Sequence, residues 1–317
     1  MTTESLLLIA VTFALVLFVL IIRIREQRSA ASYMSERLLT LMIKQSLIPI
    51  RKSLDQLAAI SSQPYSIPLA LQRFANIEES SFEGMQVFTF TGGKTNKTLL
   101  YLHGGAYVEQ PYFAHWFFLQ RLAKLSSCTI VVPIYPKAPH QGASEVLPLL
   151  CRFAASFPEE HLVLGGDSAG GGLALALAQV LSSEHHLPFS QLILISPWLD
   201  IELSHIGIDY LAERDPMLDR DKLVMYGKAW KQELSGQDYR VSPLYGSLKE
   251  LCPITLFVGT HELFLADARA LRAKAKQEGA ILEYHEGRKM NHDYPLFPIP
   301  EANRVIMRIA RLIGEEV

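Results

Sequence analysis

A serine bracketed by glycines is the feature that most constrains how this chain can fold. The motif Gly166-Asp167-Ser168-Ala169-Gly170 lies between a short apolar run, residues 162–165, and a stretch rich in small residues, 170–181. This spacing is typical of a sharp strand-to-helix turn that raises one serine above the edge of a sheet. The turn strains the serine backbone, and a Cβ two residues before or after it would clash. The motif therefore predicts a strand, a helix and, between them, a candidate nucleophile, Ser168.

Short strand-like runs alternate with helical segments along most of the chain, which indicates an α/β fold. Such alternation favours a mostly parallel sheet covered by helices on both faces. Ligands of these sheets bind beyond the carboxyl ends of the strands, so the residues that directly follow strands are the candidates for chemistry. The expected strands are 87–91, 99–102, 129–133, 162–165, 192–196, 254–258 and 281–285, and the expected helices are 113–125, 143–157, 170–181, 219–234, 267–278 and 301–313.

An insertion at about 198–245 interrupts the alternation. It contains Asp215-Pro216-Met217-Leu218 and several aromatic residues. An apolar insertion at the carboxyl edge of a sheet is either a lid over a substrate or a surface excursion that never touches it.

A nucleophilic serine needs a base, and the base needs a carboxylate to orient it. On an elbow of this kind the chain order is serine, acid, histidine. His292 follows the last expected strand, and a neutral imidazole with a pKa near about 6.5 is a suitable base. Glu262 follows the strand 254–258 and is the candidate acid. Asp267 is the alternative, although a carboxylate at a helix start is already explained by capping and the helix dipole.

A glycine-rich loop supplies the third requirement, donors for a developing oxyanion. His103-Gly104-Gly105-Ala106-Tyr107 follows the strand 99–102. Its backbone N–H groups at Gly104, Gly105 and Ala106, together with that of Ala169, are the candidate oxyanion hole. Removing one such donor typically slows turnover by roughly a hundredfold or more.

Charge and cysteine content exclude other classes of protein. Lys and Arg number 30 against 32 Asp and Glu, so no basic field favours nucleic acid as a partner. The three cysteines, Cys128, Cys151 and Cys252, are odd in number and far apart, which favours free thiols in a reducing compartment. No cysteine and histidine cluster has the spacing of a zinc site, so no metal is expected.

The N-terminus predicts a membrane anchor. Residues 5–22 are almost continuously apolar, and about 18 such residues can span a bilayer. A cleaved signal peptide is the rival interpretation, but no Lys or Arg precedes the run and no small-x-small site follows it. Arg23, Arg25 and Arg28 follow instead, which places the bulk of the chain in the cytosol. We therefore expect a single-pass anchor at 1–25.

Residues 26–80 are expected to form a helical linker or cap segment. Apolar residues recur at helical spacing over 26–60, with a kink or split expected at Pro49. This segment can lie on the membrane, cap the active site, or pack as an ordinary helix pair. The catalytic domain is expected over 81–317, including the insertion at 198–245.

From about Met85 to its end, the chain resembles the hormone-sensitive-lipase-like family of α/β hydrolases, which includes bacterial carboxylesterases and acetyl esterases. The resemblance implies ester hydrolysis through an acyl-serine, a helical cap, and no metal or organic cofactor. Ala106 stands where a third glycine is usual, and Glu262 stands where the family has Asp. The matching stretches are His103-Gly104-Gly105-Ala106, Tyr135-Pro136-Lys137-Ala138-Pro139-His140, Gly166-Asp167-Ser168-Ala169-Gly170-Gly171, Ser196-Pro197-Trp198-Leu199-Asp200, Asp215-Pro216-Met217-Leu218 and Gly259-Thr260-His261-Glu262.

The expected function is a membrane-anchored serine hydrolase with a Ser168–His292–Glu262 triad. Its expected substrate is a small, hydrophobic, short-acyl ester, and its other partner is the membrane. An amide, a lactone or an acetylated sugar or lipid is the alternative substrate on the same triad. A non-catalytic membrane-binding module is a third hypothesis. The sequence makes no prediction of the oligomeric state.

Overall fold

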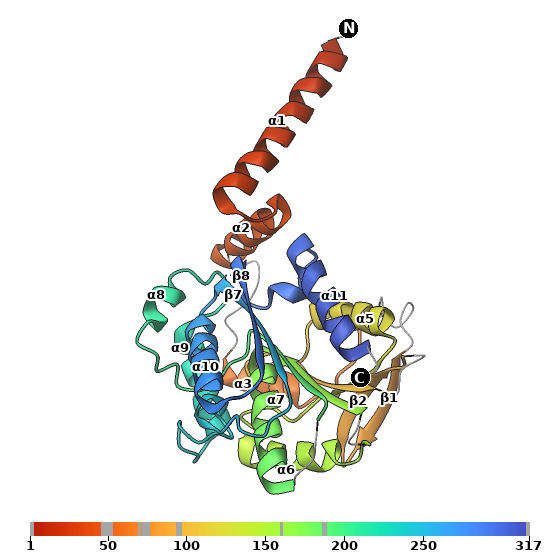
Figure 1. The fold of residues 1–317 in the computed structure, drawn as a ribbon, viewed down its shortest axis with the longest axis vertical. Coiled ribbons are helices and arrows are strands. Elements are labelled where there is room, and N and C mark those ends of the chain that lie inside the picture. The colour runs from red at the N-terminus through yellow and green to blue at the C-terminus, as the bar shows by residue number, and fades with distance from the viewer. Residues whose placement is uncertain are drawn as a thin grey trace.

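An eight-stranded sheet organises the computed structural model, which describes residues 3–45, 53–68, 71, 77–92, 97–158, 161–185 and 189–314 (Figure 1). The strand order is β1-β2-β4-β3-β5-β6-β7-β8. β2 pairs antiparallel with β1 and β4, and all other neighbours are parallel. The strands are β1 (Ile77–Phe82), β2 (Met85–Phe90), β3 (Thr98–Leu102), β4 (Thr129–Pro133), β5 (Leu162–Asp167), β6 (Gln191–Ile195), β7 (Ile254–His261) and β8 (Leu282–Asn291).

Helices cover both faces of this sheet, and a separate apolar core fills each side. One core joins the sheet to α6, α7, α9 and α10, and the other joins it to α5 and α11. The helices of the domain are α5 (Phe113–Ser126), α6 (Ala143–Ala154), α7 (Ser168–Val180), α8 (Ile208–Ala212), α9 (Arg220–Lys231), α10 (Leu265–Glu278) and α11 (Pro300–Gly314), with short helical turns at Leu181–His185, Pro243–Tyr245 and Tyr294–Leu296. The expected mostly parallel α/β architecture is confirmed.

The edge strand β1 was not predicted, and its burial pattern explains why. Four of its six residues are exposed, so the strand shows neither an apolar run nor a clear alternation. It exists because it pairs along its whole length with β2, whose residues are mostly buried. Cross-strand pairing, which a local pattern does not report, decides this element.

The segment over 26–60, expected to be helical with a kink or split at Pro49, contains two helices among the described residues. α1 (Thr3–Glu26) ends before Gln27, which has a positive φ of 55°, and α2 (Ala30–Lys44) begins after Ser29. The Ser29 hydroxyl caps α2 by accepting a hydrogen bond from the Ser32 amide, and this cap starts a new helix direction. α3 (Leu54–Ser61) follows, and the kink expected at Pro49 lies outside the described residues.

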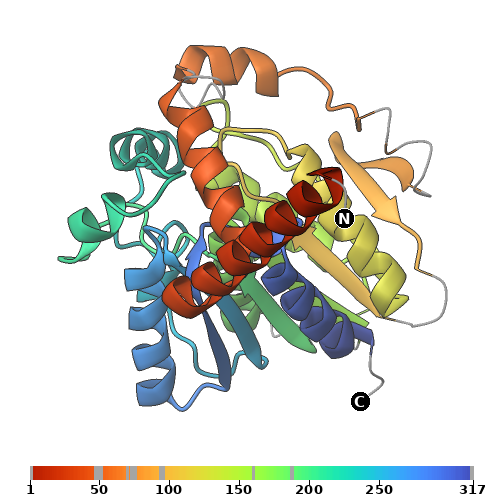
Figure 2. The same cartoon turned by 90° about the horizontal axis from the view of Figure 1, so that it is seen from above.

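The first helix projects away from the domain. Within its stretch Ser5–Glu26, an 18-residue window has a mean hydropathy of 3.1, and the side chains of the stretch are almost entirely exposed. Among the described helices, it is the one that is long and apolar enough to cross a membrane. Figure 1 shows α1 extending from α2, and Figure 2, which looks from that end, shows α2 lying across the domain. α1 packs against α2, and its last residue, Glu26, accepts a hydrogen bond from Lys289 Nζ in β8 at 2.8 Å.

Candidate active site

The strand-to-helix turn after β5 has the strained geometry that its motif predicts. Ser168 has a φ of 51° and is the first residue of α7, so its side chain stands at the N-terminal end of that helix. A Cβ on Gly166 would collide with the carbonyl of Gly170, and a Cβ on Gly170 would collide with the carbonyl of Leu102. Both glycines are therefore required by close backbone approach.

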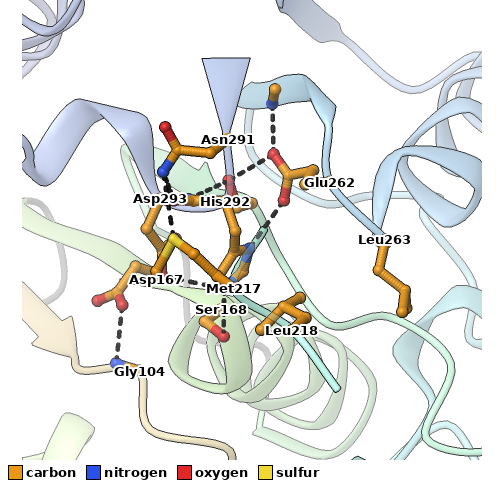
Figure 3. A network of polar contacts seen from close by, with 12 residues as sticks. Gly104, Asp167, Ser168, Met217, Leu218, Glu262, Leu263, Asn291, His292 and Asp293 are labelled. Carbon is orange, nitrogen blue, oxygen red and sulfur yellow. Dashed lines mark hydrogen bonds and ion pairs between the residues drawn. The ribbon is translucent and has the colours of Figure 1, made fainter. Parts of the chain in front are cut away.

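His292 joins Ser168 to Glu262 (Figure 3). Its Nε2 lies 2.9 Å from the Ser168 Oγ, and its Nδ1 lies 2.8 Å from Glu262 Oε2. All three side chains are buried. The three residues come from the loops after β5, β7 and β8, so the parallel sheet gathers them at its carboxyl edge.

Glu262 is held as an acceptor by two further donors. Its Oε1 accepts hydrogen bonds from the Ser196 hydroxyl at 2.9 Å and from the Gly259 amide. The Ser196 hydroxyl in turn accepts from the Asp293 amide at 3.1 Å. The carboxylate is thus fixed in position with its second oxygen directed at the imidazole.

The alternative acid, Asp267, lies elsewhere. It is buried in the first turn of α10, while the hydrogen bond to His292 Nδ1 is made by Glu262. Burial raises the pKa of Asp267 to about 8, and the nearby charge of Asp200 adds to this rise. A carboxyl group that is neutral at pH 7 is poorly suited to stabilise an imidazolium.

A second carboxylate approaches the same imidazole. Asp293 Oδ2 lies 3.1 Å from His292 Nε2. Burial by itself lowers the pKa of His292, but the charges and hydrogen bonds of Asp293 and Glu262 outweigh it and hold that pKa well above its usual range. Burial raises the pKa of Asp293, and the imidazolium opposes that rise. Asp293 was not among the site residues predicted from the sequence.

The glycine-rich loop after β3 carries three consecutive residues with positive φ. Gly105, Ala106 and Tyr107 have φ angles of 122°, 52° and 65°. Two non-glycine residues in this region mark a strained segment whose shape the surrounding structure imposes. Gly104 is engaged differently, because its amide donates a hydrogen bond to Asp167 at 3.0 Å.

Asp167, next to the nucleophile, ties this loop to the elbow. Its fully buried carboxylate accepts hydrogen bonds from the Tyr101 hydroxyl at 2.7 Å and from the Gly104 amide, and it pairs with His115 Nε2 at 2.9 Å. Burial opposes ionisation of both Asp167 and His115. Their mutual attraction nevertheless lowers the pKa of Asp167 and raises that of His115. An ionisable residue at the end of an apolar strand signals such a network, but nothing in the sequence points to His115.

The insertion between β6 and β7 packs against the loops of the candidate site and is not a separate surface excursion. Asp215 accepts hydrogen bonds from the amides of Met217 and Leu218 and, through its other oxygen, from the amide of Leu263. The side-chain amide of Asn291 donates a hydrogen bond from Nδ2 to the Met217 sulfur at 3.2 Å. Figure 3 draws Met217 and Leu218 together with Ser168 and His292, and the contact with Asn291 brings Met217 next to the histidine loop. The insertion is thus tied to the loops that carry Glu262 and His292.

A match to the family described as "alpha/beta hydrolase fold" covers residues 99–296, which include every residue of this site. The chain belongs to the α/β-hydrolase family. Within the described residues, no group of three or more His, Cys, Asp or Glu side chains is placed to hold a metal ion.

Relatives of this hydrolase carry esterase and lipase names. An esterase of Acinetobacter venetianus is 26% identical over 269 residues, which are 82% of this chain and 86% of that protein. A triacylglycerol lipase of Mycobacterium tuberculosis is 30% identical over 226 residues, 69% of this chain, and the chain spans only 47% of that lipase. An acetyl-hydrolase of Streptomyces hygroscopicus is 30% identical over 220 residues, 66% of this chain and 73% of that protein.

Solved structures agree with the branch that the motifs indicated. The crystal structure of an esterase from the bacterial hormone-sensitive lipase family superposes with a TM-score of 0.75 and 26% identity, covering 88% of this chain and 97% of that one. The chain is therefore a hormone-sensitive-lipase-like α/β hydrolase, as its motifs suggested. The expected enzyme class, a carboxylic ester hydrolase, is confirmed with it.

Proposed function

We propose that this hydrolase cleaves carboxylic esters through an acyl-serine intermediate on Ser168, His292 and Glu262. The observation that carries the proposal is the position of His292. Its two ring nitrogens lie 2.9 Å from the Ser168 Oγ and 2.8 Å from Glu262, inside a buried site at the carboxyl edge of the sheet. A serine, a base and an orienting carboxylate in hydrogen-bond contact are the arrangement that activates a serine hydroxyl.

In the acylation step, Ser168 Oγ attacks the ester carbonyl carbon and its proton passes to His292 Nε2. The bond to the alcohol oxygen then breaks, and the departing alkoxide takes that proton. Water attacks the acyl-serine in the second half of the reaction and gives its proton to His292. The carboxylic acid leaves as Ser168 regains a proton. Glu262 stabilises the imidazolium that forms in both halves.

The amides of Gly105, Ala106 and Ala169 are the donors we propose for the oxyanion. The first two belong to the strained loop after β3, and the third lies at the N-terminal end of α7, whose dipole favours negative charge. Gly104, which was among the expected donors, directs its amide to Asp167. We therefore assign Gly104 the role of holding the loop against the elbow.

The apolar side chains of the insertion that contacts the Glu262 and His292 loops support a small, hydrophobic acyl group. Met217 and Leu218 come from the insertion, which we propose as the cap over about 198–245. An amide, a lactone or an acetylated sugar or lipid would use the same triad. The names of the relatives, esterase, lipase and acetyl-hydrolase, favour the ester.

We further propose that α1 is a retained single-pass anchor with the catalytic domain on the cytoplasmic side. The division is an anchor at 1–25, a helical linker at 26–80 and a hydrolase domain at 81–317. Arg23 and Arg25 at the end of α1 support the orientation. Contacts of Arg28 and Ser29 with the hydrolase domain support retention, because cleavage after α1 would place both residues at a free chain end and loosen these contacts.

The test is hydrolysis of p-nitrophenyl esters of increasing acyl length by the full chain, compared with Ser168→Ala and with Ser62→Ala, a control at an exposed serine. We expect Ser168→Ala to abolish the reaction and Ser62→Ala to retain it, with the rate highest for short acyl groups. A fluorophosphonate probe should label the wild type and not Ser168→Ala. Full activity in Ser168→Ala would refute the assignment, and labelling without activity on any ester would favour an amide or lactone substrate.

A further inference from the structure

Helix α2 leaves an apolar face uncovered. Met34, Leu38 and Leu41, spaced three to four residues apart, are each at least half exposed. The positions follow the period of one helix face, so the side chains form a stripe along α2. The opposite face packs on the domain through Ser32 and Glu36, which are both buried.

The charged residues of α2 also differ between its buried and its exposed face. Its single carboxylate, Glu36, points into the protein, while the exposed Arg37 and Lys44 flank the apolar stripe. Arg23 and Arg25 lie just before it, in the last turn of α1. An apolar stripe with a cationic border and no exposed carboxylate is complementary to the interface of a bilayer that contains anionic lipid.

The position of α2 directly after α1 places this apolar stripe at the depth of the lipid headgroups. The 24 residues of α1 extend roughly 36 Å, slightly more than the hydrocarbon thickness of about 30 Å. The end of α1 therefore reaches the headgroup region when the helix spans the membrane, and α2 begins only four residues later at Ala30. Figure 2 shows α2 lying across the end of the domain from which α1 projects.

Polar contacts fix this pair of helices on the domain. Arg28 pairs with Glu36 and donates to the Lys289 carbonyl at 2.5 Å, and Glu36 also pairs with His261 at 2.8 Å. The Ser29 amide and hydroxyl donate to the Glu301 carboxylate at the start of α11.

These contacts lie at the catalytic edge of the sheet. His261 is the last residue of β7 and directly precedes Glu262, and Lys289 lies near the end of β8, three residues before His292. The helix pair is thus attached to the same edge of the sheet that carries the candidate triad.

We propose that α2 is an interfacial helix whose Met34, Leu38 and Leu41 side chains rest in the lipid surface, so that the catalytic edge of the sheet faces the bilayer. This inference depends on the proposed anchor α1, and it places the site where it takes an ester dissolved in the membrane. The occupant of the apolar stripe is the bilayer itself.

The test uses the full chain in nanodiscs of phosphatidylcholine and phosphatidylglycerol, with brominated acyl chains as a quencher of tryptophan fluorescence. Single tryptophans are introduced by Leu38→Trp in α2, Leu15→Trp within α1, and Ile281→Trp at the amino end of β8. All three sites are exposed, at 57%, 60% and 67%. The native tryptophans Trp116, Trp198 and Trp230 are no more than 1% exposed and provide a constant background.

Bromine near the headgroup should quench Leu38→Trp most, and bromine near the chain end should quench Leu15→Trp most. Ile281→Trp, at the far edge of the sheet, should keep its fluorescence. Quenching of Leu15→Trp with none at Leu38→Trp, or quenching of Ile281→Trp, overturns the inference and leaves the anchor intact. No quenching at Leu15→Trp overturns the anchor and the inference together.

Two further measurements distinguish the absence of an interfacial helix from misfolding of one variant and from failure of the proposed catalytic function. Leu41→Trp repeats the measurement one helical turn away, so loss of folding at one position does not decide the outcome. Ester hydrolysis by each variant is measured in the same nanodiscs. Because quenching does not depend on catalysis, an inactive but quenched protein refutes the proposed function without refuting the interfacial helix.

Discussion

The carboxylate of Asp293 lies 3.1 Å from the same nitrogen of His292 that faces the Ser168 hydroxyl at 2.9 Å. The imidazole therefore has carboxylates on both sides, with Glu262 at Nδ1. Both stabilise the protonated ring, and together they hold the pKa of His292 well above its usual range despite burial. Burial raises the pKa of Asp293 to about 7. Since only the neutral imidazole accepts the serine proton, the ionised form of Asp293 opposes the first step of catalysis.

Asp293→Asn should make the enzyme active at lower pH. Removing this negative charge destabilises the imidazolium, so the pKa of His292 falls and the neutral base persists to lower pH. The rising limb of the kcat/KM profile should move down by roughly one pH unit or more, as for loss of an adjacent opposite charge. The measurement is the pH profile on a soluble ester, with exposed Asp209→Asn as the control. An unmoved or upward-shifted limb would contradict this role.

Glu262→Gln should abolish most activity, whereas Asp267→Asn should retain it. Glutamine keeps the size of Glu262 but cannot stabilise the imidazolium, and a comparable change in serine proteases lowers kcat by about 10⁴-fold. Asp267 is buried in α10, its pKa is raised to about 8, and the amide substitutes for a neutral acid. Single-point kinetics on both variants decides between the two acids. Loss of activity in Asp267→Asn alone, with a folded protein, would reverse the assignment.

His115→Leu should strongly destabilise the protein. It leaves the Asp167 carboxylate buried without its cation, and breaking a buried pair costs about 3–5 kcal/mol. Tyr101→Phe removes one neutral donor from the same carboxylate and should cost only about 1–3 kcal/mol. Thermal unfolding of the detergent-solubilised chain compares the two variants. Equal losses would show that the His115–Asp167 pair is not ionised.

The His115–Asp167 pair also predicts how the stability of the protein changes with pH. The pKa of Asp167 is lowered, so its contribution to stability is present above its unfolded value and is lost as the pH falls through the folded one. The pKa of His115 is raised, so its contribution is present below its unfolded value and is lost as the pH rises through the folded one. The difference in Tm between wild type and His115→Leu should therefore shrink at both extremes of pH.

Met217→Ala should shift acyl preference toward longer chains. The Met217 sulfur contacts Asn291, the residue before His292, so we expect alanine at this position to leave space on the acyl side of the site. A change of this size in an apolar pocket alters the ratio of kcat/KM between substrates by roughly tenfold. The ratio of octanoyl to acetyl ester hydrolysis measures it, with Met225→Ala on the exposed side of α9 as the matched control. An unchanged ratio would place the acyl group elsewhere.

Local sequence patterns predicted most of the fold. β4 has the residues expected, and the strand before Ser168 and the helix after it begin within two residues of the expected positions, because each is a buried apolar run bounded by turn residues. β1 was missed because its residues are mostly exposed. The point at which α2 begins is set by a long-range contact, because Ser29 is held by Glu301, a residue 272 positions away in the chain.

The candidate site, like the fold, was predicted only in part from the sequence. Ser168, Glu262 and His292 follow strands in a recognisable order, so the sequence by itself determined which residues to bring together and the family to which the chain belongs. Only the tertiary structure decided that Glu262 rather than Asp267 contacts His292. It also decided that the Gly104 amide donates to Asp167 and that the Asp293 carboxylate lies against the His292 ring. These outcomes depend on distances of a few ångströms between side chains from separate loops. The folded sheet sets those distances, and no spacing along the chain encodes them.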